Sequence, residues 1–123
     1  MTVQALATQI RASLCGLTSE QAEELARAVD RVVAELRPER IYAFGSHARG
    51  DATAESDVDL FVVVPDTDVP MHRQAHSAYV AVGPHLLPLD ILVMTRSEFE
   101  RRLPALASLP ATVVREGRLL YAA

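Results

Sequence analysis

The segment from Leu60 to Val64, with the sequence LFVVV, is the feature that most constrains how this chain can fold. All five residues are apolar and three of them are β-branched. A strand with one face in water alternates apolar and polar residues, whereas a strand covered on both faces reads as a continuous apolar run. The segment is also far too short to cross a bilayer. It therefore predicts a central β-strand over about 58–64 with packed layers on both sides.

The rest of the chain supplies elements for those layers. Thr18 and Gln21 have the spacing of a capping box, and apolar residues continue at helical spacing until Pro38 stops the helix. Ser97 is the expected cap of another helix, and Pro104 an expected kink or break in it. Further helices are expected over about 3–15, 46–50, 70–82, 97–107 and 110–117, and further strands over 41–44, 89–94 and 118–121. Helices alternating with buried strands predict an α/β or α+β domain, in which a mixed β-sheet is flanked by helices.

Length and composition predict a single domain over residues 1–123, with a helical amino-terminal segment over 1–17. The amino terminus does not read as a signal peptide, and the single cysteine, Cys15, fits a reducing compartment, so a cytoplasmic location without a membrane partner is expected. Cys15 is expected to be a buried structural thiol. The net charge of −4 argues against bulk nucleic-acid binding. All twelve basic residues are arginine, which excludes mechanisms that need a lysine.

Three carboxylates are associated with the predicted buried strands. Asp57 and Asp59 are two residues apart, so their side chains share one face of the strand. Asp90 is the only charge in the apolar run LPLDILVM, and it would join the pair if the two strands were neighbours. Carboxylates gathered in this way repel one another unless a cation neutralises them, and hard oxygen ligands suit Mg²⁺ or Mn²⁺. The alternatives are a solvated loop for the pair and a structural ion pair with an arginine for Asp90.

The turn before the central strand has the residues of a phosphate site. Gly45 permits a tight turn with close backbone approach, and Ser46 offers a hydroxyl and an amide to a terminal phosphate. Arg49 follows one turn later and could form paired hydrogen bonds with phosphate oxygens, or it could be a surface residue of a short helix. His47 lies inside the turn but receives no role. His72 and His76 have a spacing that can hold zinc, but no third ligand accompanies them, so a solvated helix face is expected.

The full motif is Gly45-Ser46, ten residues, then Asp57-x-Asp59, in the form GSHARG…SDVDLFVV with a later LDILV. It resembles the nucleotidyltransferase superfamily of the DNA polymerase β type, and the short chain is similar to its minimal nucleotidyltransferases over roughly residues 20–121. The resemblance implies that Asp57 and Asp59 bind metal ions bridging ATP, and that Asp90 completes the site and helps deprotonate the acceptor hydroxyl. It also implies that Gly45 and Ser46 hold the terminal phosphates.

The resemblance further implies a partner. Minimal members are usually paired with a HEPN protein, and similar antitoxins silence a HEPN ribonuclease by transferring AMP from ATP to one of its tyrosines. Two alternatives stay open: nucleotidyl transfer to a small molecule or an RNA end, and a non-catalytic module that neutralises a HEPN toxin by contact. The apolar stripe over 22–36 is expected to be core, with a partner or homo-oligomer surface as the alternative for part of it.

Overall fold

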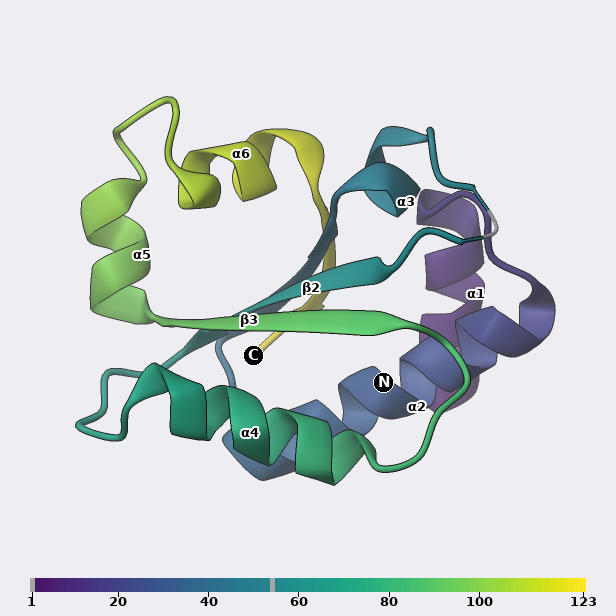
Figure 1. Ribbon diagram of the computed structural model, residues 1–123, viewed down its shortest axis with the longest axis horizontal. Coiled ribbons are helices and arrows are strands. Elements are labelled where there is room, and N and C mark those ends of the chain that lie inside the picture. The colour runs from purple at the N-terminus through teal and green to yellow at the C-terminus, as the bar shows by residue number, and fades with distance from the viewer. Residues whose placement is uncertain (1, 54) are drawn as a thin grey trace.

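The computed structural model describes residues 2–53 and 55–123. Met1, in the predicted amino-terminal segment, and Ala54, in the stretch before the predicted central strand, lie outside the described residues. In the described part, one mixed sheet has the strand order β3-β2-β1-β4 (Figure 1). Its strands are β1 (Arg40–Phe44), β2 (Val58–Val64), β3 (Leu89–Thr95) and β4 (Arg118–Ala122). β2 runs parallel to β3 and antiparallel to β1, which is antiparallel to β4.

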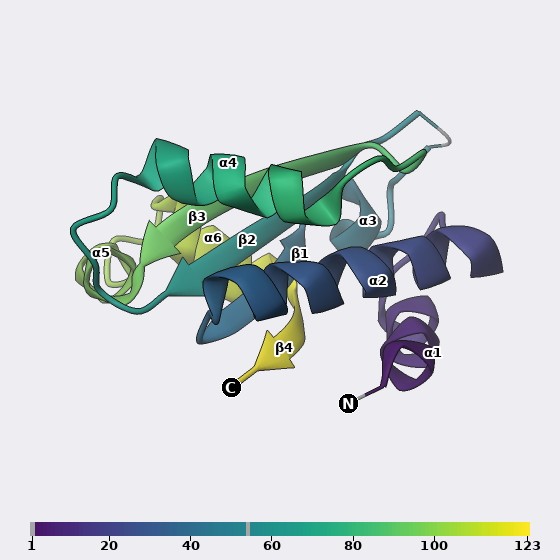
Figure 2. The same cartoon turned by 90° about the horizontal axis from the view of Figure 1, so that it is seen from below.

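Helices cover both faces of this sheet. They are α1 (Val3–Ser13), α2 (Ser19–Leu36), α3 (Ser46–Arg49), α4 (Met71–Val82), α5 (Arg96–Arg102) and α6 (Leu109–Glu116). Figures 1 and 2 show α2 and α4 on one face and α5 and α6 on the other, with α1 beside the amino-terminal part of α2. The predicted class, a mixed sheet flanked by helices, is confirmed. Over the described ranges, no helix is long and apolar enough to cross a membrane.

The central strand β2 joins two hydrophobic cores. Leu60 and Val62 pack on the face covered by α2 and α4, whereas Phe61 and Val63 pack on the opposite face against Phe99 of α5. Every residue of β2 except Asp59 is buried, as the continuous apolar run predicts. Each large apolar side chain buried in this way contributes roughly 1.5–3 kcal/mol to stability. β2 is therefore held firmly, and its one polar residue has a fixed position.

Helix α2 is specified by local signals and by one buried face. Gln21 N donates to Thr18 Oγ1 over 3.1 Å, and Thr18 N donates to Gln21 Oε1 over 3.0 Å, so the predicted capping box is formed. Leu25 and Val29 are fully buried at helical spacing. The helix ends at Leu36, and the left-handed Arg37 follows it. Because this face is in the core, the expectation that the stripe over 22–36 is core is confirmed.

The helix predicted over 97–107 has a different cap and a shorter span. The cap is Thr95, whose Oγ1 accepts from Glu98 N over 3.3 Å, because Ser97 N and its hydroxyl both donate to the carboxylate of Asp66. The helix ends at Arg102 and Pro104 lies in the turn that follows, so the expected break near Pro104 is confirmed and a kink is not formed. The structure differs from two further expectations. The last helix, expected to start at Pro110, starts at Leu109 with Ser108 as its cap, and Cys15, expected to be buried, is only partly buried.

Candidate active site

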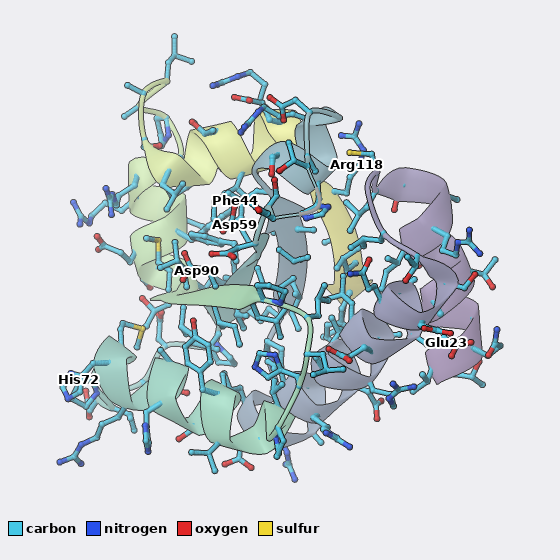
Figure 3. The ribbon with its side chains drawn as sticks, turned by 45° about the vertical axis from the view of Figure 1, so that its right-hand side comes forward. Glu23, Phe44, Asp59, His72, Asp90 and Arg118 are labelled. Carbon is cyan, nitrogen blue, oxygen red and sulfur yellow. The ribbon has the colours of Figure 1, made fainter. Side chains whose placement is uncertain are left out.

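Strand pairing brings the predicted site residues to one end of the sheet. Phe44, the last residue of β1, lies opposite Asp59 of β2, so Gly45 and Ser46 follow directly beside that carboxylate. Asp90 of β3 is the register partner of Asp59 on the other side. Figure 3 shows Phe44, Asp59 and Asp90 grouped together. The strands that carry Asp59 and Asp90 are therefore neighbours, which was the condition for the two acids to meet.

The electrostatic environment of Asp59 shows that these groups act on one another. Its pKa is raised above the ordinary value of 3.8, first because burial disfavours the charged form. The carboxylates of Asp90 and Asp57 raise this pKa further, while His47 and Arg49 lower it. Asp59 is half-buried, whereas Asp57 and Asp90 are exposed. One partly desolvated carboxylate thus lies between two acids, with the guanidinium of Arg49 on the side of the turn.

The backbone at Gly45 fits closely against this carboxylate. Gly45 has φ 77° and ψ −155°, a conformation that is essentially restricted to glycine. A Cβ added to Gly45 would overlap a carboxylate oxygen of Asp59. Glycine is therefore required here twice, by the conformation of the turn and by the approach of the Asp59 side chain.

The turn itself is a single helical turn, α3. The carbonyl of Gly45 accepts from Ala48 N over 3.1 Å and from Arg49 N over 3.0 Å, which closes the turn. Ser46 is half-buried at its start. Arg49 is exposed, and its Nε lies 3.5 Å from Asp51 Oδ2. Because Arg49 also lowers the pKa of Asp59, it is close enough to act on the acids, and its predicted phosphate contact stays a prediction.

The fold bears on the alternative interpretations of these acids. Asp59 belongs to β2, so the interpretation as a solvated loop is wrong for this residue, although the exposed Asp57 does precede the strand. None of the ion pairs among the described residues involves Asp90, which leaves its alternative as a structural ion pair without support. His72 and His76 are both exposed on α4, as expected of a solvated face. His72 projects away from Asp59 and Asp90 (Figure 3).

Two residues near the site received no role from the sequence. The ring of His47 is buried and bonded through both nitrogens, Nδ1 to the Cys15 carbonyl over 2.8 Å and Nε2 to the Ser56 carbonyl over 3.2 Å. Tyr79 of α4 accepts a hydrogen bond from Ile91 N at its hydroxyl, beside Asp90. The position of His47 inside the motif was a usable signal. Tyr79 gave none, because its place depends on how α4 packs beside β3.

Comparison with known proteins agrees with this geometry. Residues 23–120 match the family model of the nucleotidyltransferase domain. The chain belongs to the nucleotidyltransferase domain family. Nucleotidyl transfer is the class of reaction for which the family is named, and all the candidate site residues lie within the matched range. Helix α1 lies before it.

One solved structure extends the likeness to nearly the whole fold of this nucleotidyltransferase domain. It is a crystal structure of a protein from Sulfolobus solfataricus that is provisionally named a nucleotidyltransferase. The TM-score is 0.61 at 18% sequence identity, and the alignment covers 95% of this chain and 87% of the other. At this identity the likeness concerns the fold alone. No curated protein sequence matches the chain at a significant level.

The family implies a divalent metal ion, and the residues of this nucleotidyltransferase domain fit one in chemistry. Carboxylate oxygens are the ligands that Mg²⁺ and Mn²⁺ prefer, and the mutual effect of Asp57, Asp59 and Asp90 is the kind that a cation relieves. The cage is not complete in the chain alone. Within residues 2–53 and 55–123, no three His, Cys, Asp or Glu side chains are placed to hold a metal ion together. Mg²⁺ commonly takes further ligands from substrate phosphates and water, which suits an incomplete protein site.

Proposed function

We propose that this domain transfers AMP from ATP to a hydroxyl group, and that the acceptor is a tyrosine of a HEPN partner protein. The observation that carries the proposal is the register of Asp59 with Asp90, directly beside the Gly45–Ser46 turn. This arrangement places acids suited to a metal-bound triphosphate next to a turn suited to its terminal phosphates. Membership of the nucleotidyltransferase family supports the general reaction. The nucleotide, the acceptor and the partner are part of the proposal.

The residues divide the work of an in-line displacement at the α-phosphorus. Asp57 and Asp59 would hold the divalent cation, which when bound neutralises charge on the triphosphate. Gly45 lets the backbone approach the terminal phosphates, and the Ser46 hydroxyl donates a hydrogen bond to them. Asp90 accepts the proton of the acceptor hydroxyl, whose oxygen bonds to the α-phosphorus. The bond from the α-phosphorus to the bridging oxygen breaks, and pyrophosphate leaves.

The exposure of the site favours an acceptor on another macromolecule. β3 is at the edge of the sheet, and both Asp90 and Asp57 are exposed. An acceptor hydroxyl can therefore approach Asp90 from an open surface, as a side chain of a partner protein would. Small-molecule sites, by contrast, are usually concave and bury most of the ligand.

The experiment uses α-labelled ATP, Mg²⁺ and a candidate HEPN partner protein, followed by intact mass measurement of both proteins. We expect an added AMP on the HEPN protein, mapped to a tyrosine by peptide mass. Asp59→Asn should abolish transfer, whereas Asp68→Asn, which changes an exposed acid in the loop after β2, should not. If the label appears on a small molecule or an RNA end, that molecule is the acceptor and the HEPN tyrosine is not. If both Asp57→Asn and Asp59→Asn still neutralise the toxin, the domain acts as a non-catalytic binding module and not as an enzyme.

A further inference from the structure

Apart from the Tyr42 hydroxyl, His47 carries the one polar side-chain group of a buried residue in the described part of the chain, and its exposed fraction is 3%. It belongs to α3, directly after Ser46 of the proposed phosphate turn. Both ring nitrogens face carbonyl oxygens, Nδ1 that of Cys15 at 2.8 Å and Nε2 that of Ser56 at 3.2 Å. A carbonyl oxygen only accepts hydrogen bonds, so an N–H of the ring is the donor toward these oxygens. His47 therefore contacts two segments that reach it from different parts of the chain.

The first segment is the connection between α1 and α2. Cys15 N donates to the His47 carbonyl over 3.0 Å, which makes the contact between the two residues reciprocal. The thiol of Cys15 also lies 3.7 Å from the Ser46 carbonyl. Gly16 has φ 73°, and a Cβ there would lie 3.2 Å from Ala52 Cβ and 3.4 Å from His47 Nδ1. This connection precedes residues 23–120, so it lies outside the part that matches the family.

The second segment leads into β2. Ser56, whose carbonyl oxygen lies 3.2 Å from His47 Nε2, immediately precedes Asp57. One side chain thus joins the turn that carries Ser46 to the backbone that carries Asp57. The other hydrogen bonds of Ser56 in the described residues are local, to Thr53. The contact with His47 is therefore the one by which Ser56, among the described residues, is tied to the turn that carries Ser46.

We propose that His47 is a positioning residue that fixes the phosphate turn relative to the metal-binding acids. Through Cys15 it also makes the amino-terminal segment, outside the family match, part of the support of the active site. The inference rests on the proposed roles of Ser46 and Asp57 as two half-sites for one metal–nucleotide complex. A ligand that spans both half-sites depends on their separation, whereas a ligand of one half-site does not. Misplacement by about 1 Å can lower a reaction rate by about 10²-fold.

The test compares one ligand that touches a single half-site with one that spans both. Mn²⁺ alone is titrated by electron paramagnetic resonance, and Mn·ATP by calorimetry, on the full chain. In His47→Phe, which keeps a ring but removes both ring nitrogens, we expect the affinity for Mn²⁺ alone to stay within about twofold. The affinity for Mn·ATP should fall about tenfold or more, with a larger loss in kcat/KM for transfer. A residue that only stabilises the fold would lower the melting temperature without separating the two affinities.

Graded variants keep the test decisive if His47→Phe folds poorly. The amide of glutamine can take the place of Nε2, so His47→Gln should retain the Ser56 link and most of the Mn·ATP affinity. His47→Asn, whose amide takes the place of Nδ1, should retain the Cys15 link and lose more of this affinity. Gly16→Ala disturbs the support from the other side, and its matched control is Gly83→Ala, with a similar φ of 69° and no neighbour within 4 Å of the added Cβ.

The results distinguish a failure of the proposed function from a failure of the proposed role of His47. If wild-type protein binds neither Mn²⁺ nor Mn·ATP, the proposed function fails and this inference fails with it. If the wild type binds both and His47→Phe binds Mn·ATP equally well, the inference alone is overturned. Equal losses of Mn·ATP affinity in His47→Gln and His47→Phe would also overturn it, because the retained Ser56 link would then have no effect.

Discussion

The hydroxyl of Tyr79 accepts a hydrogen bond of 2.7 Å from the amide of Ile91. Along a parallel pair, alternate residues direct their backbone groups toward the neighbouring strand, and those between them direct theirs away. β3 is at the edge of the sheet, so Tyr79 supplies a partner for an amide that has no further strand beside it. The same hydroxyl lies 3.5 Å from Asp90 Oδ1. Helix α4 packs on the face of the sheet opposite the one that carries the Asp59 side chain. At the edge of the sheet, however, the Tyr79 side chain of α4 reaches Asp90 of the candidate site.

Tyr79→Phe is expected to lower kcat for transfer by up to about tenfold while leaving the KM for ATP unchanged. The variant keeps the ring but removes the hydroxyl that holds the backbone beside Asp90, and one hydrogen bond contributes about 0.5–1.5 kcal/mol. Steady-state kinetics at saturating acceptor measure the effect, with Tyr121→Phe on β4 as the matched control. A rise in KM with unchanged kcat would show that the hydroxyl does not act through Asp90.

Gly45→Ala is expected to abolish transfer and to cost more stability than Gly83→Ala. The two glycines have nearly the same backbone, φ 77° with ψ −155° and φ 69° with ψ −162°, so both variants carry a similar strain of about 1–3 kcal/mol. Only at Gly45 does the added Cβ overlap the Asp59 carboxylate. Chemical denaturation of both variants isolates that overlap. Equal free energies of unfolding would mean that Asp59 moves aside without cost.

Asp59→Asn is expected to raise the free energy of unfolding at neutral pH while it abolishes transfer. Burial and the neighbouring acids raise the pKa of Asp59 in the folded protein above the value of 3.8 that it has when unfolded. Between these two pKa values the folded state binds more protons, so stability falls as pH rises through that window and stays lowered above it. Asparagine does not ionise and avoids this loss. Thermal unfolding should show the gain at pH 7 and its disappearance below pH 3.8.

The affinity for Mn²⁺ is expected to fall with decreasing pH earlier than at an ordinary aspartate site. A metal ion binds the ionised carboxylate, and the raised pKa of Asp59 means that protons compete for it at a higher pH. Titrations of Mn²⁺ at a series of pH values measure the dependence. An affinity that stays constant down to pH 3.8 would place Asp59 outside the metal site.

Thr18→Ala is expected to destabilise the fold by about 1 kcal/mol without changing kcat. The substitution removes the oxygen that accepts from Gln21 N and so breaks one half of the capping box of α2. Denaturant unfolding and a transfer assay on the same preparation measure the two quantities. Ser19→Ala provides a control at the next position, where the hydroxyl is not the cap.

The parts of the structure that follow from the sequence are those with a local or repeated signal. The capping pattern of Thr18 and Gln21 locates the start of α2, and the apolar run over 60–64 locates β2 as a central strand. The spacing of Gly45-Ser46 and Asp57-x-Asp59 predicts which residues form the phosphate turn and which acids belong to the site. Once the strands pair, the position of Asp90 beside Asp59 follows as well.

The parts that do not follow depend on contacts between distant segments. Ser97 has the chemistry of a cap, but the carboxylate of Asp66, in the loop after β2, occupies both its amide and its hydroxyl. Thr95 then caps α5 instead. The roles of His47 and Tyr79 depend on carbonyl and amide groups that carry no residue-specific signal, since every residue has them. A sequence pattern cannot indicate which backbone group a side chain meets.

Because β1 pairs with β2 in an antiparallel ladder, the effect of an insertion on the site depends on whether it falls in the connection between the strands or within the ladder. Phe44 and Asp59 are opposite each other because of the ladder between the strands, and the connection from Asp51 to Thr53 takes no part in that ladder. Residues added to that connection would lengthen a loop and leave Asp59 beside Gly45. A shift of one residue within the ladder would instead turn Asp59 into the core under α2 and α4 and expose an apolar neighbour at the site. The chemistry of the site is thus tied to the pairing of two strands more than to the distance along the chain between its motifs.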